Sequence, residues 1–589
     1  MRWWHSIVAA GFIFLLIFFI WALFPEKKEF ESLTSMSSGP VAVGSSPMVL
    51  ISGSEPTDEP WISRSPAARR VRRIFPDTSW MTPEPTLKAG DQITLSLFDD
   101  AIFDAKIRNV TVYPNGAVGM TAHLTGDDRG TVYLAYIGQK VRASIEVMGG
   151  ADYMIRYRSD VAAHYAIEID REHSVILGCA DAALQPLKEA LADPLPSAET
   201  TSPVAQAEEP SEATMIDVMV VYTPAAASWA AGDPDEDGIE SVIALAMQRA
   251  NETHANSDTR VTLRLVHSAE INYMEAAGSS GYVTDLNYLS GTTDGYMDEV
   301  HDWRDEYGVD LVCLLEVTDG TGGYAHVLYN QSGDSSSAFC LVRVQQASWT
   351  YTVVHEWGHN MGCHHSKTQA SSAGTGLYDY YSSGWQWNDT AAASTDPGSS
   401  YYGIDGYCSV MTYEDFDGIA GKEYRRIAYF SNPNVDYTGD STNPTGDAAD
   451  GDNARTIRNI RSVIANYREE SQDLDMDGLP NDWELQYFGG ETNANPSAIA
   501  SNGMNTVLEA YIAGLDPTNS ASVFDVVFTN GFVVRWNATF GRVYSVFGST
   551  NLSESFQALE TNILWPQSSW TDTVEKAASF YHVDVQLAE

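Results

Sequence analysis

Two kinds of hydrophobic pattern divide the chain and predict two kinds of folded region. Between residues 92 and 170, short runs of alternating apolar and polar residues are separated by turn signals such as Pro114-Asn115-Gly116, which is typical of a small β domain. From residue 215, unbroken apolar runs of strand length alternate with helical patterns. That order predicts an α/β domain with a twisted, mostly parallel sheet.

The second region reads as strand, helix, strand, helix and strand, at residues 215–224, 239–254, 261–266, 295–307 and 309–317. Residues 322–326 (GGYAH) follow the last strand. They are compatible with an edge strand, where an extended peptide substrate would pair, or with a surface turn. A last helix carries its apolar side chains on one stripe and is expected to close the domain. The stripe consists of Ile457, Ile460, Val463, Ile464 and Tyr467.

The stretch VHEWGHNMGCHH carries the strongest chemical signal in the chain. His355 and His359 stand four apart on a predicted helix, so both imidazoles project from one face at a separation that suits a single Zn²⁺. Gly362 lets the helix end in a left-handed turn, which would bring in His365 as a third ligand. Glu356 is rotated by about 100° from His355, which places its carboxylate where it can accept a proton from water as a general base.

The specificity of this motif comes from its full length. H-E-x-x-H recurs by chance, whereas the extended H-E-x-x-H-x-x-G-x-x-H is far more specific and is complete here. A gluzincin is excluded, because no Glu lies between Glu356 and Glu414. An aspzincin arrangement, with Asp379 in place of His365 as the third ligand, is the weaker alternative. His364 is out of register with the motif and is expected at the rim or in solvent.

Residues 408–413 (CSVMTY) look like the Met-turn that supports the zinc site in metzincin peptidases. Met411 would pack beneath the metal without binding it. Tyr413 matches a tyrosine that in astacins and serralysins approaches the zinc and helps to stabilise the oxyanion, although in other metzincins this position is not Tyr. Tyr413 is therefore a candidate catalytic residue beside Glu356.

Residues 215 to about 470 resemble a bacterial reprolysin-like metzincin, related to the adamalysins and near the peptidyl-Asp metalloendopeptidases. The resemblance implies a metzincin fold, zinc and endopeptidase activity, and it covers under half of the chain. The chain departs from the relatives at Ser366, where Asp is common, and at Gly322-Gly323, where Cys-Gly is common. The matching segments are 216–218, 221–224, the zinc helix from His355, 409–413, 429–433 and 452–456.

The length and the charge of the chain limit the number of domains and the kinds of partner that can be expected. The chain has 589 residues, of which 44% are hydrophobic, enough for several domains with well-formed cores. With 79 acidic and 34 basic residues, the net charge is −45. This charge argues against nucleic acid as a partner and for a highly soluble, exported protein, which we expect to be a monomer that binds protein or peptide substrates.

The N-terminal half is predicted to contain targeting, linker and propeptide segments. Residues 1–30 include an apolar run from 7 to 24 and are a signal peptide or a membrane anchor, so the protein is expected outside the cell or in its envelope. Residues 31–87 are rich in Ser, Pro and Gly and are predicted to be a low-complexity linker. Residues 88–178 would form a β-rich propeptide domain, and 179–213 a linker with the activation cleavage site.

The chain contains five cysteines. Cys313, Cys340, Cys363 and Cys408 fall in the predicted catalytic domain (214–470), where an exported protein could form two disulfides with any of three pairings. Cys179 falls in the predicted propeptide. Its thiolate could occupy the fourth position of the zinc and keep a zymogen silent, or it could be an ordinary buried thiol.

The C-terminal part begins with a pattern typical of a calcium loop. Asp473-x-Asp475-x-Asp477-Gly478, with Leu479 offering its carbonyl and Glu484 in twelfth position, fits an EF-hand-type Ca²⁺ site in residues 471–520; the alternative is an acidic linker. A second half with Asn502-Gly503 and Glu509 lacks acidic residues at its first ligand positions and is expected to bind weakly or not at all. Residues 521–589 alternate as strands and predict a small β-sandwich.

Together these patterns predict a secreted or surface zinc metalloendopeptidase that is made as a zymogen. The alternative from another class is a calcium-dependent surface-binding protein with a vestigial protease domain. The intact Glu356 argues against it, because loss of the general base is the simplest route to an inactive enzyme.

Overall fold

The computed structural model of the chain describes residues 47–56, 68–83, 85–126, 129–169, 174, 176–179, 213–232, 238–369, 372–378, 380–388, 404–414, 424–437, 443–469, 472–475, 477–529, 533–573 and 580–588. The predicted signal peptide or anchor at 1–30, most of the predicted cleavage linker, and Asp379 lie outside these residues. In the part of the chain that is described, no helix combines the length and the apolar character that crossing a membrane requires.

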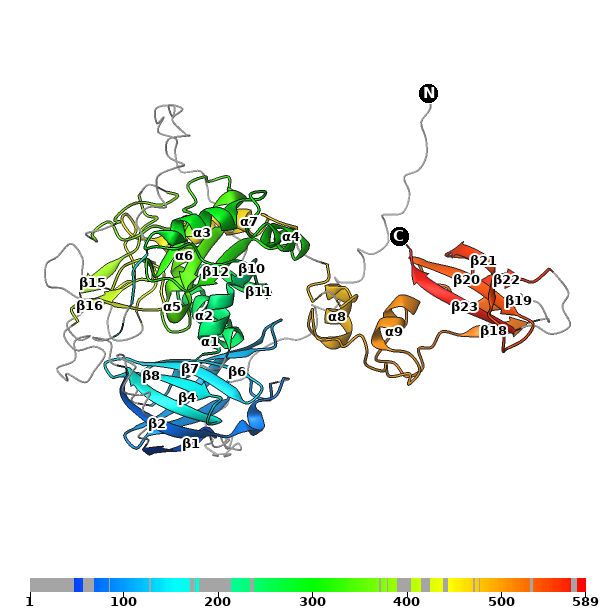
Figure 1. Cartoon of the computed structure of the whole chain (residues 1–589), viewed down its shortest axis with the longest axis horizontal. Coiled ribbons are helices and arrows are strands. Elements are labelled where there is room, and N and C mark those ends of the chain that lie inside the picture. Colours follow the sequence, from blue (N-terminus) through cyan, green and yellow to red (C-terminus); the bar gives the residue numbers. More distant parts are fainter. Residues whose placement is uncertain are drawn as a thin grey trace, which may run out of the picture. The chain divides into compact units, whose positions relative to one another are not determined.

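The described residues between 48 and 169 form a closed β-barrel (Figure 1, blue to cyan). Its strands follow the order β1-β2-β9-β8-β7-β6-β5-β4-β3. Alternate side chains point inward and fill the interior; in β3, for example, Ile93, Leu95 and Leu97 are fully buried. The strands are β1 Met48–Pro56, β2 Ala68–Pro76, β3 Gln92–Phe98, β4 Ala101–Val112, β5 Val118–Leu124, β6 Gly130–Ile137, β7 Lys140–Val147, β8 Asp152–Arg158 and β9 Ala163–Ile169.

Strands β1 and β2 correct the prediction of a linker over residues 31–87. The arginines of β2 hide its strand pattern in the sequence, because Arg70 and Arg72 stand on the same side of β2 as Ile74, whose side chain lies in the barrel core. Arg70 contacts Asp100 at 2.8 Å and Arg72 contacts Asp99 at 2.8 Å, while Ile74 is buried. This arginine-rich run is therefore part of a strand, and two of its charges are paired with acidic residues.

The second folded region is built on a sheet with the order β11-β10-β12-β14-β13. The strands are β10 Thr214–Tyr222, β11 Val261–Glu270, β12 Leu311–Glu316, β13 Gly323–Ala325 and β14 Phe339–Arg343. The first four are mutually parallel, and β13 runs antiparallel to β14 at the edge. This is the predicted mostly parallel sheet, and of the two interpretations of residues 322–326 the edge strand is correct.

Helices cover both faces of this sheet. Side chains alternate along β10, so Val218 and Val220 join one buried cluster, whereas Met219 and Val221 join the other. Helix α1 begins directly at Pro224, with the Thr223 side chain as its N-cap; the proline ends the strand and also starts a helix. The helices are α1 Pro224–Ala230, α2 Ile239–Asn256, α3 Gly281–Ser290, α4 Glu299–Glu306, α5 Val344–Ala347, α6 Thr352–Asn360 and α7 Asn453–Ile464.

The barrel packs against α2 of this second region (Figure 1). The guanidinium of Arg249 in α2 is 1% exposed and pairs with Glu146 of the barrel at 2.7 Å. A second buried ion pair joins Arg425 to Asp152 of the barrel at 2.6 Å. The apolar barrel residues in the same buried cluster as α2 are Tyr113, Ala117, Tyr133 and Ala135. The interface is thus both apolar and closely matched in charge.

A buried carboxyl group lies at the end of β12. Glu316 is fully buried, and neither of its carboxylate oxygens has a hydrogen-bond partner. Burial, and then the nearby charges of Asp285 and Glu275, raise the pKa of Glu316 to about 9. The folded protein therefore holds the proton of Glu316 at pH values where an unfolded glutamate has already lost it.

This raised pKa predicts a stability effect with a definite sign. The pKa of an unfolded glutamate is about 4.3, whereas the pKa of Glu316 in the folded protein is about 9. Between these two pH values, unfolding releases the proton. The contribution of Glu316 to the free energy of unfolding therefore falls as pH rises through this range. Glu316→Gln removes this dependence. Its melting temperature should match that of the parent near pH 5 and exceed it near pH 9. The exposed Glu306→Gln is the matched control, and equal differences at both pH values would contradict the assignment.

The C-terminal part contains two short helices, α8 Asn481–Phe488 and α9 Val507–Ala513. Two three-stranded sheets follow, with the orders β18-β19-β22 and β21-β20-β23. Both contribute to one small core of Val534, Trp536, Tyr544, Val546 and Ile563. The strands are β18 Val526–Thr529, β19 Val533–Trp536, β20 Arg542–Ser549, β21 Gln557–Leu564, β22 Ser569–Thr571 and β23 Phe580–Leu587.

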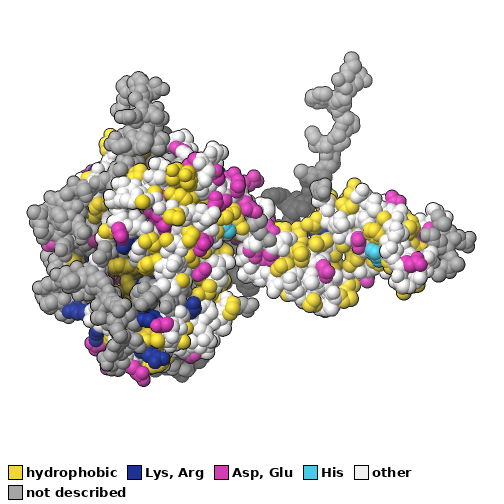
Figure 2. Space-filling view, viewed as in Figure 1, with side chains coloured by type: hydrophobic (Ala, Val, Ile, Leu, Met, Phe, Trp, Pro, Cys, Tyr) yellow, Lys and Arg dark blue, Asp and Glu magenta, His cyan; other side chains and the backbone are white. Residues whose placement is uncertain are grey.

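The acidic composition is visible on the surface. On the face shown in Figure 2, Asp and Glu side chains are spread over the described surface, whereas most of the visible Lys and Arg side chains lie over the barrel. On this face, the described part of the second region shows few Lys or Arg side chains.

Candidate active site

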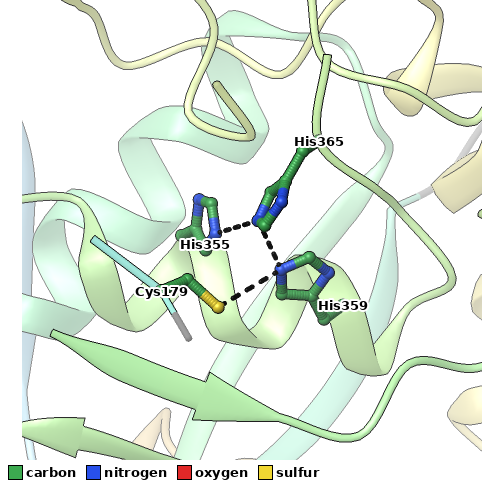
Figure 3. Close-up of side chains that lie close together, drawn as sticks. All are labelled: Cys179, His355, His359 and His365. Carbon is green, nitrogen blue, oxygen red and sulfur yellow. Dashed lines mark hydrogen bonds between the residues drawn. The ribbon is translucent and has the colours of Figure 1, made fainter. Parts of the chain in front are cut away.

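The three predicted histidine ligands come together at the end of α6. His355 and His359 project from one face of this helix, and His365 returns to them after the turn at Gly362, whose φ of +81° is in the left-handed region. The Nε2 atom of His365 lies 3.0 Å from the Nε2 atoms of both His355 and His359. Figure 3 shows the three rings pointing toward one another.

The second ring nitrogen of each histidine is held by the backbone. Because a carbonyl oxygen only accepts hydrogen bonds, each Nδ1 carries the proton, and each Nε2 is left with a free lone pair. Burial lowers the pKa of all three rings, in the case of His359 to about 3, so they are neutral. The acceptors are the carbonyl oxygens of Val410, Cys363 and Ser372, at 2.7, 3.0 and 3.0 Å.

This donor set fits Zn²⁺. Three neutral imidazoles are a common ligand set for catalytic zinc, and a tetrahedral site with Zn–N distances of about 2.0–2.1 Å has its nitrogens about 3.3 Å apart, close to the separations seen here. The backbone acceptors supply the orienting contacts that such ligands need. The aspzincin alternative is untested, because Asp379 lies outside the described residues.

The Met-turn supports the helix that carries the ligands. A side chain at Gly358 would lie 2.5 Å from the Met411 sulfur and 3.1 Å from the Phe430 ring. Met411 is fully buried. Glycine between His355 and His359 is therefore required for the close packing of α6 on the turn.

Glu356 is buried beside the histidines. Its Oε1 has no hydrogen-bond partner, and its Oε2 lies 3.5 Å from the Cys179 sulfur. Burial raises the pKa of Glu356 to about 8, while the contact with Cys179 and the positive charge of Arg426 oppose that shift. A Cβ on Gly323 would lie only 2.2 Å from Oε1, so the edge strand passes directly over the carboxylate. This glutamate has the burial and the raised pKa that a general base requires.

Tyr413 and Cys179 complete the cluster. The Tyr413 ring lies 4.8 Å from the His365 ring, and its hydroxyl donates to the Cys179 carbonyl oxygen at 2.7 Å. The Cys179 sulfur lies 3.8 Å from Nε2 of His359. One ligand atom from each of Cys179, His355, His359 and His365 falls within 4.8 Å of all the others, as Figure 3 shows.

The segment that carries Cys179 lies along the edge strand. The carbonyl oxygen of Gly178 accepts from the Gly322 amide at 2.9 Å and from the Thr321 hydroxyl at 3.2 Å. The Gln346 side chain binds the backbone of Leu177 twice: its Oε1 accepts from the Leu177 amide at 3.1 Å, and its Nε2 donates to the Leu177 carbonyl oxygen at 3.0 Å. A backbone bridge pairs Cys179 with Gly323 in parallel. The backbone groups that an extended peptide would use are therefore occupied by the chain itself.

Comparison with known proteins identifies this region. Residues 212–413 match the model of metallopeptidase family M12, of the reprolysin type. This region is therefore similar to the reprolysin-type metallopeptidases. Peptidyl-Asp metalloendopeptidases of Stenotrophomonas maltophilia strains K279a and R551-3 are 29% and 30% identical to this chain over 265 residues, which is 45% of this chain and 55% of each relative. The chain thus spans about half the length of these curated relatives.

A third relative and one solved structure complete the comparison. The peptidyl-Asp metalloendopeptidase of Xanthomonas campestris pv. campestris is 28% identical over 264 residues, 45% of this chain and 54% of that relative. Metalloproteinase-II from Bacteroides fragilis aligns with 49% of this chain and 85% of its own at a TM-score of 0.30 and 12% identity.

Two expectations about the metallopeptidase domain need correction. All five cysteines are free thiols, so neither of the two permitted disulfides is formed. Cys313 and Cys340 face each other on neighbouring strands, but Cys363 and Cys408 lie apart at the zinc turn and the Met-turn. His364 is 2% exposed rather than solvated, and its Nδ1 accepts from the His365 amide at 2.8 Å, which helps to hold the third ligand.

The predicted calcium loop precedes α8. One carboxylate oxygen from each of Asp473, Asp475 and Asp477 lies within 4.8 Å of the others. Burial and the charges of its two neighbours raise the pKa of Asp475 to about 6. Glu484 is fully buried, and its Oε2 has no hydrogen-bond partner. Leu479, the predicted carbonyl ligand, is also buried.

Three residues near the site escape sequence reasoning. Gln346 and Thr321 bind the segment that carries Cys179, and Arg426 contacts the Met-turn, where its Nε donates to the Thr412 carbonyl oxygen at 2.9 Å. Gln346 lies on the short helix α5, Thr321 precedes β13, and Arg426 ends the short strand β17 (Tyr424–Arg426), and no local sequence pattern marks any of the three. The charge of Arg426 in an acidic chain was the one available signal.

Proposed function

We propose that this protein is a zinc-dependent metalloendopeptidase that hydrolyses peptide bonds of protein substrates. The main support is that the Nε2 atoms of the three histidines lie together beside the Glu356 carboxylate, whose Oε1 has no hydrogen-bond partner. His355, His359 and His365 would hold Zn²⁺, which supplies Lewis-acid polarisation of the substrate carbonyl and of water. Glu356 would accept a proton from the attacking water and later donate it to the leaving amine. Tyr413 would donate to the oxyanion once Cys179 has left.

The substrate would lie extended along β13. Its backbone would take over the Gly322 amide and the Gln346 side chain, which now bind Gly178 and Leu177. The relatives are named peptidyl-Asp metalloendopeptidases, and we extend cleavage beside an acidic residue to this chain. The nearby Arg426 charge supports that extension.

A peptide-library digest tests the function directly. The purified protein should cleave peptides, cleavage should stop with a zinc chelator, and added Zn²⁺ should restore it. Cleavage that persists after complete removal of zinc would refute the proposal. The alternative of a vestigial protease is not favoured, because the base and the ligand set are intact.

We further propose that the protein is made as a zymogen. The Cys179 thiolate would fill the position next to the three histidines, while the backbone of residues 177–179 blocks the edge strand. The barrel would act as the propeptide domain that delivers this segment, anchored on α2 by the buried Arg249–Glu146 pair. Cleavage within 180–212 would then free the segment.

The apolar run at 7–24 supports the further proposal that the protein is exported, as a secreted or membrane-anchored monomer without nucleic-acid partners. Cell fractionation with an antibody against the C-terminal domain tests this. A cytoplasmic pool alone would contradict export.

We propose Ca²⁺ for the loop of Asp473, Asp475 and Asp477. Three clustered carboxylates repel one another until a divalent cation neutralises them, and oxygen ligands are those that Ca²⁺ prefers. The buried Glu484, with its free Oε2, adds support as the carboxylate at position twelve.

Calcium removal should therefore increase proteolytic nicking around residues 471–520. Digestion by an added protease in calcium and in a calcium-selective chelator, followed by mass spectrometry, measures the effect. Asp475→Asn should be nicked equally in both conditions, whereas Asp482→Asn, on the exposed side of α8, should respond like the parent. Equal nicking of the parent with and without calcium would make the stretch an acidic linker.

A further inference from the structure

One side chain of the acidic loop at 473–477 is part of the metallopeptidase core. Leu474, which lies between Asp473 and Asp475, is 5% exposed and belongs to a buried cluster whose other members all fall between residues 219 and 341. The hydrophobic effect therefore holds the loop against the metallopeptidase domain. The cluster includes Met219 of β10, Val266 of β11 and Val300 of α4.

A chain of ion pairs attaches the same tail segment to the same sheet. Glu491, which follows α8, accepts a hydrogen bond from Nη1 of Arg264 on β11 at 2.6 Å. Arg264 also donates through Nε and Nη2 to the carboxylate of Asp217 on β10, at 2.7 and 2.9 Å. The side chains of Arg264 and Asp217 are only 17% and 7% exposed, so water and salt screen this pair weakly. The tail is thus attached to β10 and β11 at two points, one apolar and one charged.

The proposed cation ligands lie on the segment between these two attachments. The Leu474 amide donates to Oδ1 of Asn481, the first residue of α8, at 2.8 Å. The Ala494 amide donates to Oε1 of Glu484 at 2.8 Å. Glu484 is fully buried, and among the described residues its Oε2 has no hydrogen-bond partner. A buried carboxylate oxygen without a partner is unfavourable, and a divalent cation is the ligand that would satisfy it beside three aspartates.

We infer that the cation of this loop stabilises the metallopeptidase domain, so that calcium controls the local opening of β11 and α4. The inference rests on the Ca²⁺ proposed above for the aspartate loop. Without a cation, the three carboxylates repel one another and the loop opens easily, which withdraws Leu474 from the cluster and Glu491 from Arg264. With a cation bound, the same opening must also release the cation. Opening therefore becomes rarer by a factor that the calcium concentration and the affinity set.

Hydrogen exchange followed by mass spectrometry tests this inference on the full-length chain. The protein is stripped of divalent cations and reloaded with Zn²⁺ alone or with Zn²⁺ and Ca²⁺, so that the two samples differ only in calcium. Calcium should slow exchange in the loop, and also in β11 (261–270) and α4 (299–306). At a free concentration of a hundred times the dissociation constant, the slowing should reach about 100-fold. Strand β4 of the barrel should exchange equally in both samples.

Two variants separate the coupling from calcium binding itself. Leu474→Ala removes no ligand oxygen, so it should keep the slowing in the loop and lose most of it in β11 and α4. Glu491→Gln removes the ion pair with Arg264 without changing the core. It should weaken the calcium effect in β11, and it decides the question if Leu474→Ala does not fold. Leu485→Ala is the matched control, because Leu485 on α8 is 50% exposed and its loss should leave the parent effect unchanged.

The possible failures can be told apart. If calcium slows exchange nowhere, the calcium loop itself is wrong and the inference falls with it. If calcium slows exchange in the loop of the parent but not in β11 and α4, the loop binds calcium and the coupling is refuted. If both variants keep the full effect in β11 and α4, the coupling does not pass through Leu474 and Glu491, and the inference is wrong. None of these readouts requires peptide cleavage, so a failure of the endopeptidase proposal is detected separately by the peptide digest.

Discussion

Glu356→Gln should lower peptide cleavage by roughly 10² or more, the scale of general acid–base catalysis, and leave bound zinc near the parent level. The substitution keeps the size of the side chain but removes the basic carboxylate. The three Nε2 atoms and their backbone-bound Nδ1 atoms do not depend on Glu356, so the metal site should persist. Two measurements on the same preparation check this prediction. Metal analysis gives the bound zinc, and cleavage of one peptide gives the activity.

His365→Ala should behave in the opposite way and lose zinc, since only His355 and His359 would remain. Activity would be lost as a consequence. If Asp379 were the third ligand instead, Asp379→Ala would lose the metal and His365→Ala would keep it. Parent-like cleavage by Glu356→Gln would show that the mechanism proposed here is wrong, whatever the zinc content.

Cys179→Ser should make the uncleaved precursor active, because a hydroxyl is a poor zinc ligand at neutral pH. The contacts that hold Leu177 and Gly178 on the edge strand would remain, so the activity of this precursor should stay below that of protein from which residues 177–179 have been released. Cleavage of a short peptide by the intact precursor, with its length verified on a gel, is the measurement.

Thiol reactivity supplies a second readout of the same proposal. Cys179 should react slowly with a thiol reagent in the zinc-loaded precursor and quickly after chelation. The other four cysteines are fully buried and serve as internal controls in the folded protein. Unchanged latency of Cys179→Ser, together with equal thiol reactivity before and after chelation, would exclude a zinc-blocking thiolate and leave obstruction by the segment alone.

Local sequence patterns predict a feature correctly where all the residues that define it lie on one helix, strand or turn. The helical spacing of His355 and His359 and the left-handed Gly362 define two ligands and the turn to the third, because both follow from backbone geometry over a few residues. The mostly parallel sheet likewise follows from apolar runs of strand length. Strands β1 and β2 are not predicted by the sequence pattern, because in β2 charged residues such as Arg70 and Arg72 interrupt the apolar alternation.

Other features escaped because they depend on contacts between distant segments. The predicted strand at 215–224 ends at Pro224, which also begins helix α1, because a proline suits the first turn of a helix. The two permitted disulfides are absent: Cys313 and Cys340 are free thiols although they face each other on β12 and β14, and Cys363 and Cys408 are free as well. His364 is buried through packing that no motif describes.

The sequence by itself located three histidines with Glu356 beside them, and an acidic loop with three aspartates. These depend on residue type and short-range spacing, which helix and turn geometry convert directly into position. Only the tertiary structure decided which groups from distant parts of the chain lie near these residues and which are buried. It placed Cys179 beside the histidines, the carboxyl of Glu316 out of reach of water, and Arg426 on the Met-turn, because the packing of whole elements, rather than spacing along the chain, sets those distances.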